Sequence, residues 1–211
     1  MKKQVKREEI ISAAKKLIIE KGYRKTSVED ITHEVGIAKG SFYTYFKSKD
    51  FLMETLLTEK AVEHKEIMAK LIDEKDSFED AVRKYVEYYL FMPTKDVEFI
   101  VVMVKMMRST DSVGEAVIKR IEANKQNRKN EFIAIMKKYE DELDISDKKD
   151  FDRYRLLVFG MINTFYLNNF LPSENGFSDL EYNEVKEKMS KVNFNYETDF
   201  MTKSILKLIQ K

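Results

Sequence analysis

The sequence predicts an all-helical protein of about nine helices, with a small N-terminal helical domain followed by a larger C-terminal one. The 211 residues contain only six glycines and two prolines, too few turn-forming residues for a sandwich or barrel of many short strands. Apolar residues recur at helical spacing through most of the chain. Length allows one or two domains at about 150 residues each, and we expect two, residues 1–46 and 47–211.

Composition excludes several kinds of site. The chain contains no cysteine and only two histidines, His33 and His64. It therefore has no disulfide framework and no thiolate or multi-histidine metal site, which fits a reducing cytoplasm. The longest unbroken apolar run, residues 99–104, is far too short to cross a membrane, and no segment resembles a signal peptide. We expect a cytoplasmic protein that needs no cofactor.

Charge is distributed unevenly along the chain. Residues 1–50 contain 12 Lys and Arg against 7 Asp and Glu, whereas residues 51–211 contain 26 against 30. A basic domain attached to an acidic remainder is expected when the small domain binds a polyanion. Because 36% of the residues are charged, chance variation is an equally good explanation at this point.

The first two helices are defined by an apolar stripe and by their ends. The first helix carries apolar residues at spacing i, i+3, i+4, i+7 and i+8, namely Ile10, Ala13, Ala14, Leu17 and Ile18. Gly22 is the expected left-handed C-cap of this helix. The second helix begins at Thr26, which forms a capping box with Glu29, and stops at Gly36.

A third helix follows after a short turn. Ala38 is its expected N-cap, Ile37 and Phe42 can form a hydrophobic staple, and Phe46 continues the buried face. The other side chains form a face of small, hydroxyl-bearing and basic groups: Lys39, Gly40, Ser41, Tyr43, Thr44 and Tyr45. Three helices within about 45 residues, the last two joined by a short turn, predict a helix-turn-helix unit.

Longer helices are expected in the remaining chain. Ser48 caps a charged helix that runs to about residue 72, and His64 on this helix is expected to be solvated. Ser77 caps the next helix, which Pro93 ends. A short apolar helix at 99–107 is expected to be buried on most sides.

The last third of the chain alternates helices with one clear loop. We expect an amphipathic helix at about 112–142, and a helix capped by Ser146 that spans 147–170 and is apolar on two faces. A loop at 171–178 leads to a short surface helix that ends near residue 192. A helix at 196–209 closes the chain.

Residues 22–52 resemble the DNA-binding signature of the TetR family of transcriptional regulators. The resemblance rests on the segments 22–31 and 35–50, which read GYRKTSVEDI and VGIAKGSFYTYFKSKD, and on Leu52. Ala38 departs from the Ser or Thr cap that is more common there, which weakens the cap by about 1 kcal/mol at most. The resemblance implies operator binding by the second helix of the pair, and a small-molecule effector bound in a helical C-terminal domain.

The candidate DNA-binding residues follow from the helix-turn-helix geometry and from the resemblance together. They comprise the exposed face of the recognition helix and hydroxyl or ammonium groups near helix starts: Thr26, Ser27, Lys39, Gly40, Ser41, Tyr43, Thr44, Tyr45 and Lys49. Taken singly, Tyr43 and Tyr45 could be half-buried aromatic residues, Lys49 a solvated lysine and Thr26 only a cap. Phe42, by contrast, is expected in the core.

Methionine and aromatic residues are frequent in the C-terminal domain. Such side chains suit a pocket for varied apolar ligands, but they equally suit a packed core. If a pocket exists, the candidate residues are Tyr88, Tyr89, Met103, Met107, Tyr154 and Phe165. A hollow of about 300 Å³ or more among the fifth to eighth helices, between about residues 77 and 170, would favour the pocket, and a solid core would favour a structural domain.

The spare apolar faces of the helices at 147–170 and 196–209 predict a homodimer joined by a four-helix interface. A dimer also places two recognition helices about 34 to 36 Å apart, one turn of DNA. The predicted function is a homodimeric regulator, a repressor that a small apolar or amphipathic ligand releases from its operator. A ligand-independent architectural DNA-binding protein and, with less support, a helical enzyme remain alternatives, although no catalytic constellation stands out.

Overall fold

The described part of the chain consists of helices, as predicted. The computed structural model describes residues 2–107, 113–145, 147–170 and 182–210. These residues form ten α-helices and one short 3₁₀-helix, and no β-strand occurs among them. None of the described helices combines the length and the apolar character that a membrane crossing requires.

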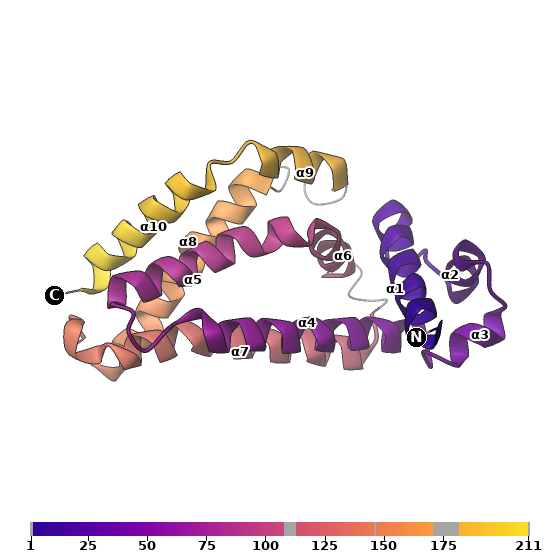
Figure 1. Ribbon diagram of the computed structural model, residues 1–211, viewed down its shortest axis with the longest axis horizontal. Coiled ribbons are helices and arrows are strands. Elements are labelled where there is room, and N and C mark those ends of the chain that lie inside the picture. Colours follow the sequence, from indigo (N-terminus) through magenta and orange to yellow (C-terminus); the bar gives the residue numbers. More distant parts are fainter. Residues whose placement is uncertain (1, 108–112, 146, 171–181, 211) are drawn as a thin grey trace.

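Three helices form a compact N-terminal unit, which we call the head (residues 2–46). They are α1 (Lys2–Lys21), α2 (Val28–Val35) and α3 (Lys39–Tyr43). The long helix α4 (Lys49–Leu71) begins at the head and extends away from it (Figure 1). Because α4 is one unbroken helix, it connects the head directly to the rest of the protein.

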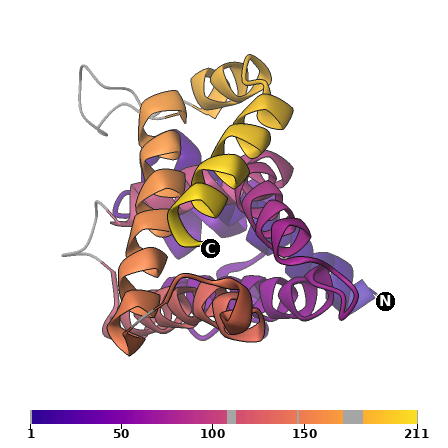
Figure 2. The same ribbon diagram turned by 90° about the vertical axis from the view of Figure 1, so that its left-hand side faces the viewer.

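The remaining helices form the body. They are α5 (Phe78–Lys95), α6 (Val97–Met107), α7 (Glu115–Lys138), α8 (Lys148–Phe170), α9 (Tyr182–Ser190) and α10 (Phe194–Ile209), with the 3₁₀-helix η2 (Glu140–Glu142) after α7. In the body α4 lies along α7, α10 packs on α5, and α8 contacts α7, α9 and α10. Figure 2 shows α8 and α10 at the end of the body that lies away from the head.

Two hydrophobic clusters stabilise this arrangement. The first is centred on the head and includes Tyr23, Phe42 and Phe46, but Val102 of α6 and Val117 of α7 also belong to it. The second joins α5, α7, α8 and α10. The core of the head is therefore closed by body helices across the predicted boundary at residue 46. That boundary stays a prediction.

Several helix ends differ from the sequence-based expectations. The cap of α2 is Ser27 and not Thr26. Pro93 does not end α5, which continues to Lys95, because a proline in the last turn removes only one backbone hydrogen bond. The helix expected to reach about residue 142 ends as an α-helix at Lys138 and continues as η2. Ser146 and the loop at 171–178 lie outside the described residues.

Candidate nucleic-acid interface

The start of α2 is fixed by a capping box. The Ser27 hydroxyl oxygen accepts a hydrogen bond from the Asp30 amide at 3.1 Å, and the Asp30 carboxylate accepts one from the Ser27 amide at 2.7 Å. Lys21 of α1 lies 2.8 Å from the same carboxylate. The hydrogen bond from Lys21 and, to a smaller extent, those from Ser27 hold the pKa of Asp30 well below its usual range. These contacts anchor α2 on the end of α1.

Gly36 turns the chain from α2 into α3. Its φ of 68° and ψ of 40° lie in the left-handed region, which glycine adopts without the steric cost that other residues incur. Its amide donates to the His33 carbonyl at 3.1 Å, and the Ile37 amide donates to the Thr32 carbonyl at 2.9 Å. The last carbonyls of α2 are thus satisfied, and α3 starts directly after the turn.

α3 has one buried and one exposed face. Phe42 is fully buried and packs in the core of the head with Phe46 and Ile31. Tyr43, on the other face, is 50% exposed, and Lys39, Gly40 and Thr44 are exposed beside it. The exposed face thus contains four of the predicted recognition residues, whose role stays a prediction. Ala38 is the N-cap, without a side-chain hydrogen bond.

Gly40 leaves open space on the exposed face of α3. A Cβ atom at this position would meet nothing within 4 Å, so no neighbour inside the protein requires glycine there. Glycine nevertheless costs about 0.5 to 1 kcal/mol relative to alanine inside a helix. No contact within the described residues therefore explains a glycine at this position.

Lys39 is paired with an acidic residue in this structure. Its ammonium forms an ion pair with the Glu29 carboxylate on α2, and both side chains are largely exposed. The hydrogen bond with Glu29 raises the pKa of Lys39 and lowers that of Glu29. Contact between Lys39 and DNA requires this ion pair to open.

Lys49 and Thr26 are directed into the protein. The Lys49 Nζ donates to the carbonyls of Tyr23 at 2.7 Å and of Thr26 at 2.8 Å, and lies 4.0 Å from the centroid of the Tyr23 ring. Burial lowers the pKa of Lys49. The Thr26 hydroxyl is buried and donates to the Gly22 carbonyl at 2.9 Å. These two groups join the turn before α2 to the start of α4.

The other three candidates differ in accessibility. Ser27 is exposed at the N-terminus of α2, although its hydroxyl serves the capping box. Ser41 is half-buried, and its carbonyl accepts the Thr44 hydroxyl at 2.7 Å. Tyr45 is half-buried against the core of the head. The nine DNA-binding candidates thus surround one end of the head, but only part of them present free polar groups.

Three exposed cations near this face were not among the candidates. Arg24 and Lys25 lie in the turn before α2, and Lys47 lies in the turn between α3 and α4. None of them takes part in an ion pair within the described residues, whereas Lys16, Lys21 and most other head cations do. Their positions in turns next to the predicted second and fourth helices can be recognised in the sequence and could have marked them as candidates.

The effector candidates lie in different parts of the body. Tyr88 and Tyr89 of α5 lie beside His64, which is buried and not solvated as expected. Tyr154 and Phe165 belong to the body cluster. Met103 packs against the core of the head, and Met107 is 47% exposed.

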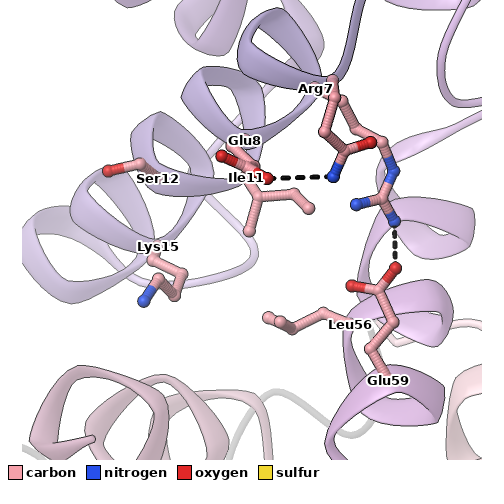
Figure 3. Close-up of a pocket in the computed structure, with 8 residues that line it drawn as sticks. Arg7, Glu8, Ile11, Ser12, Lys15, Leu56 and Glu59 are labelled. Carbon is pink, nitrogen blue, oxygen red and sulfur yellow. Dashed lines mark hydrogen bonds and ion pairs between the residues drawn. The ribbon is translucent and has the colours of Figure 1, made fainter. Parts of the chain in front are cut away.

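Two pockets of about 360 Å³ each are present at the surface. The first lies between α1 and α4, where the Arg7 guanidinium pairs with Glu59, and Ile11 and Leu56 also line it (Figure 3). The second lies at the ends of α8, α9 and α10 and is lined by Asn168, Lys188 and Glu197 among others. Neither is lined by the six effector candidates, which stay predictions.

Residues 10–56 match the family model described as bacterial regulatory proteins of the tetR family. These residues therefore form a TetR-type DNA-binding domain. The matched segment contains the whole helix-turn-helix unit and the first turns of α4, and the predicted family is confirmed. The TetR-type domain is thus the part of the chain whose relationship to known proteins is closest.

Two curated relatives of the TetR-type domain are regulators from Bacillus subtilis. The uncharacterized HTH-type transcriptional regulator YuxN is 50% identical over 48 residues, which are 23% of this chain and 16% of YuxN. The fatty acid metabolism regulator protein is 38% identical over 73 residues, 35% of this chain and 38% of the relative. The matches therefore span less than half of these relatives.

A solved structure resembles most of the chain in fold. The transcriptional regulator FadR from Bacillus subtilis, in complex with stearoyl-CoA, has a TM-score of 0.66 and 20% sequence identity. The alignment covers 93% of this chain and 96% of FadR. The body thus shares its fold with a known regulator, while its sequence has diverged.

Proposed function

We propose that this protein is a homodimeric transcriptional regulator of the cytoplasm, a repressor that binds operator DNA through α3 and releases it when a small apolar or amphipathic molecule binds the body. The observation that carries the proposal is the exposed face of α3 within a TetR-type domain. The buried Phe42 on the opposite face packs α3 against the core of the head. The second helix of a helix-turn-helix pair enters the major groove.

The exposed residues of α3 suit base recognition. Lys39 and Tyr43 reach outward with an ammonium and a hydroxyl, and the open space at Gly40 allows the backbone to approach a base edge. Lysine and hydroxyl groups are ordinary partners of base edges in the major groove. The inward-directed Lys49 stabilises the turn before α2, and Arg24, Lys25 and Lys47 take over phosphate contacts.

The dimer is proposed to form through α8 and α10. α8 exposes Leu156, Leu157, Phe159 and Leu167, and α10 exposes Tyr196, Phe200 and Leu208. Large apolar side chains gathered on adjacent helices mark an interface. Gly160 lies on the same side of α8 with nothing within 4 Å of a Cβ, which leaves room for the close approach of a partner helix.

Effector binding is proposed for the region around α5, since the candidates Tyr88 and Tyr89 lie there with the buried His64. An effector shifts operator affinity only by its preference for one conformer of the body over another. The similar FadR was solved with stearoyl-CoA, so a long-chain acyl-CoA is the first compound to test, beside a panel of apolar molecules.

The test of the proposed function is operator binding. A duplex is selected from a random-sequence pool with the full-length protein, and its affinity is measured by fluorescence anisotropy. Lys39→Ala and Tyr43→Ala should each weaken binding by about 1 to 3 kcal/mol while the protein stays folded. Lys65→Ala, an exposed lysine of α4 far from the recognition face, is the matched control.

Unchanged affinity in both variants would exclude α3 as the recognition helix. If the wild type binds the duplex and no compound of the panel changes its affinity, the body acts only as a structural support, as in an architectural DNA-binding protein. Release of the protein from the duplex by one class of compound supports a body that binds an effector.

A further inference from the structure

Two polar contacts join α4 to α7, which lie side by side in both views (Figures 1 and 2). The Asn124 Nδ2 donates to the Leu57 carbonyl at 3.3 Å, and the His64 Nε2 lies 2.7 Å from the Glu131 Oε1. Each contact joins residues 67 positions apart. Equal offsets mean that the helices run in the same direction and that the contacts repeat after one heptad. We call them the register contacts.

The His64–Glu131 contact is buried and connects three helices. His64 is only 8% exposed, and its Nδ1 lies 2.6 Å from the Tyr88 hydroxyl of α5. The second oxygen of Glu131 accepts the hydroxyl of Tyr89. Since a buried polar group is costly when it loses its partner, a shift of α4 relative to α5 and α7 is opposed at this point.

Asn124 also helps to fix how α4 and α7 align, at a cost in folding stability. Its Oδ1 is buried and has no hydrogen-bond partner among the described residues, which costs free energy that an apolar side chain would not. A single polar residue between packed helices is a well-attested way to specify their register.

At the head, α7 abuts the first turn of α4. Gly114, the N-cap of α7, has φ −62° and ψ 148°, a conformation open to any residue. A Cβ there would nevertheless come within 3.0 Å of the Asp50 Cγ. Asp50 in turn accepts a hydrogen bond from the buried Tyr23 hydroxyl of the head. Movement of α4 on α7 is therefore transmitted to the head without an intervening loop.

We propose that His64, Glu131 and Asn124 are positioning residues for operator recognition, because they hold α4 in one register on α7 and so fix the separation of the two heads. The inference rests on the proposed dimeric operator binding. His64 follows Lys49 by 15 residues, about 22 Å along α4 at 1.5 Å per residue. A tilt of about 9° at His64 moves the head by about 3.4 Å, one base-pair step.

The experiment compares three duplexes. They are the operator selected by the wild type, the same operator with one base pair added between its half-sites, and a single half-site. The variants are Glu131→Leu, Asn124→Leu and the conservative Glu131→Gln, with Glu122→Leu as the same change at an exposed position of α7. Circular dichroism and thermal melting check the fold of each.

Glu131→Leu and Asn124→Leu should bind the operator about tenfold more weakly, within the 5- to 150-fold range of couplings between sites, and the half-site within about twofold of wild type. Their preference for the original spacing should shrink. Glu131→Gln should keep operator affinity and spacing preference close to those of the wild type. Its side-chain amide can form a hydrogen bond with the His64 Nε2 whether that nitrogen donates or accepts. Glu122→Leu should not differ from wild type.

Two results would overturn the positioning role of the register contacts, and a third would overturn the proposed function. If both leucine variants keep operator affinity and spacing preference while their melting temperatures fall, the register contacts serve stability alone. An equal loss for the operator and the half-site would place the defect inside the head and also overturns the inference. Should Glu131→Leu fail to fold, Asn124→Leu decides. A wild type that selects no duplex contradicts the proposed function itself.

Discussion

Lys47, in the turn directly after the head, provides a quantitative test of which cations contact DNA phosphates. It is exposed in the turn between α3 and α4, and its Nζ lies 5.8 Å from the Phe51 ring centroid. No acidic group within the described residues pairs with it. Lys16 of α1 is also exposed, but it forms an ion pair with Glu34. The two lysines therefore make a matched pair, one available to DNA and one engaged.

The expected effect follows from counterion release. Each phosphate contact contributes about 0.9 to the slope of log Kobs against log salt concentration. The proposed dimer contains two copies of Lys47, so Lys47→Ala should reduce the magnitude of the slope by about 1.8. Between 50 and 200 mM salt, the variant should then lose about twelvefold less affinity than the wild type loses.

Anisotropy titrations of the selected operator at several salt concentrations in this range give the slope directly. Lys16→Ala should keep the slope of the wild type. A Lys47→Ala slope equal to that of the wild type would refute the assignment of Lys47 as a phosphate contact. Equal reductions in Lys47→Ala and Lys16→Ala would show that the ion pairs of the head do not determine which cations bind.

Other predictions concern stability and assembly. Ser27→Ala removes the cap of α2 and should lower the free energy of unfolding by about 1 kcal/mol, measured by urea denaturation; an unchanged midpoint would contradict the role of the capping box. Because the folded-state pKa of Asp30 lies below its ordinary value of 3.8, its stabilisation is present above that value and lost as the pH falls below it. Asp30→Asn should therefore flatten the acid limb of the stability curve, and a limb as steep as that of the wild type argues against this. Gly36→Ala forces a left-handed alanine and should cost about 1 kcal/mol, seen as a lower melting temperature. Phe159→Glu should convert the proposed dimer to a monomer in sedimentation experiments with helix content retained, and a persistent dimer would exclude this face of α8.

Local signals in the sequence were sufficient for several helix ends and for the buried face of α3. The capping residues Ser48 and Ser77, the left-handed Gly22 and the buried Phe42 all depend on neighbours within a few positions, and the structure has each as expected. The error at Thr26 is of the same local kind. Thr26 and Ser27 are both suitable capping residues, and each is followed three positions later by an acidic residue. The pattern therefore fits both positions, and the predicted cap was wrong by one residue.

Contacts between distant segments explain what the sequence did not reveal. Lys49 is directed inward by carbonyls that lie 26 and 23 positions earlier, and no local pattern specifies them. His64 is buried by Tyr88 and Glu131, on two other helices. A signal did exist, since His64 shares a helical stripe with Met53, Leu57 and Met68, yet the surrounding charges obscured it.

The contact between Gly114 and Asp50 has an electrostatic consequence. α4 and α7 run in the same direction, so both helix dipoles place their positive ends beside the head, each equivalent to about half an elementary charge. The Asp50 carboxylate lies in the first turn of α4 and against the N-cap of α7, and one negative charge thus counters both ends. The same residue that holds the head on the body reduces the repulsion between two parallel helices, at the edge of a surface proposed to face DNA.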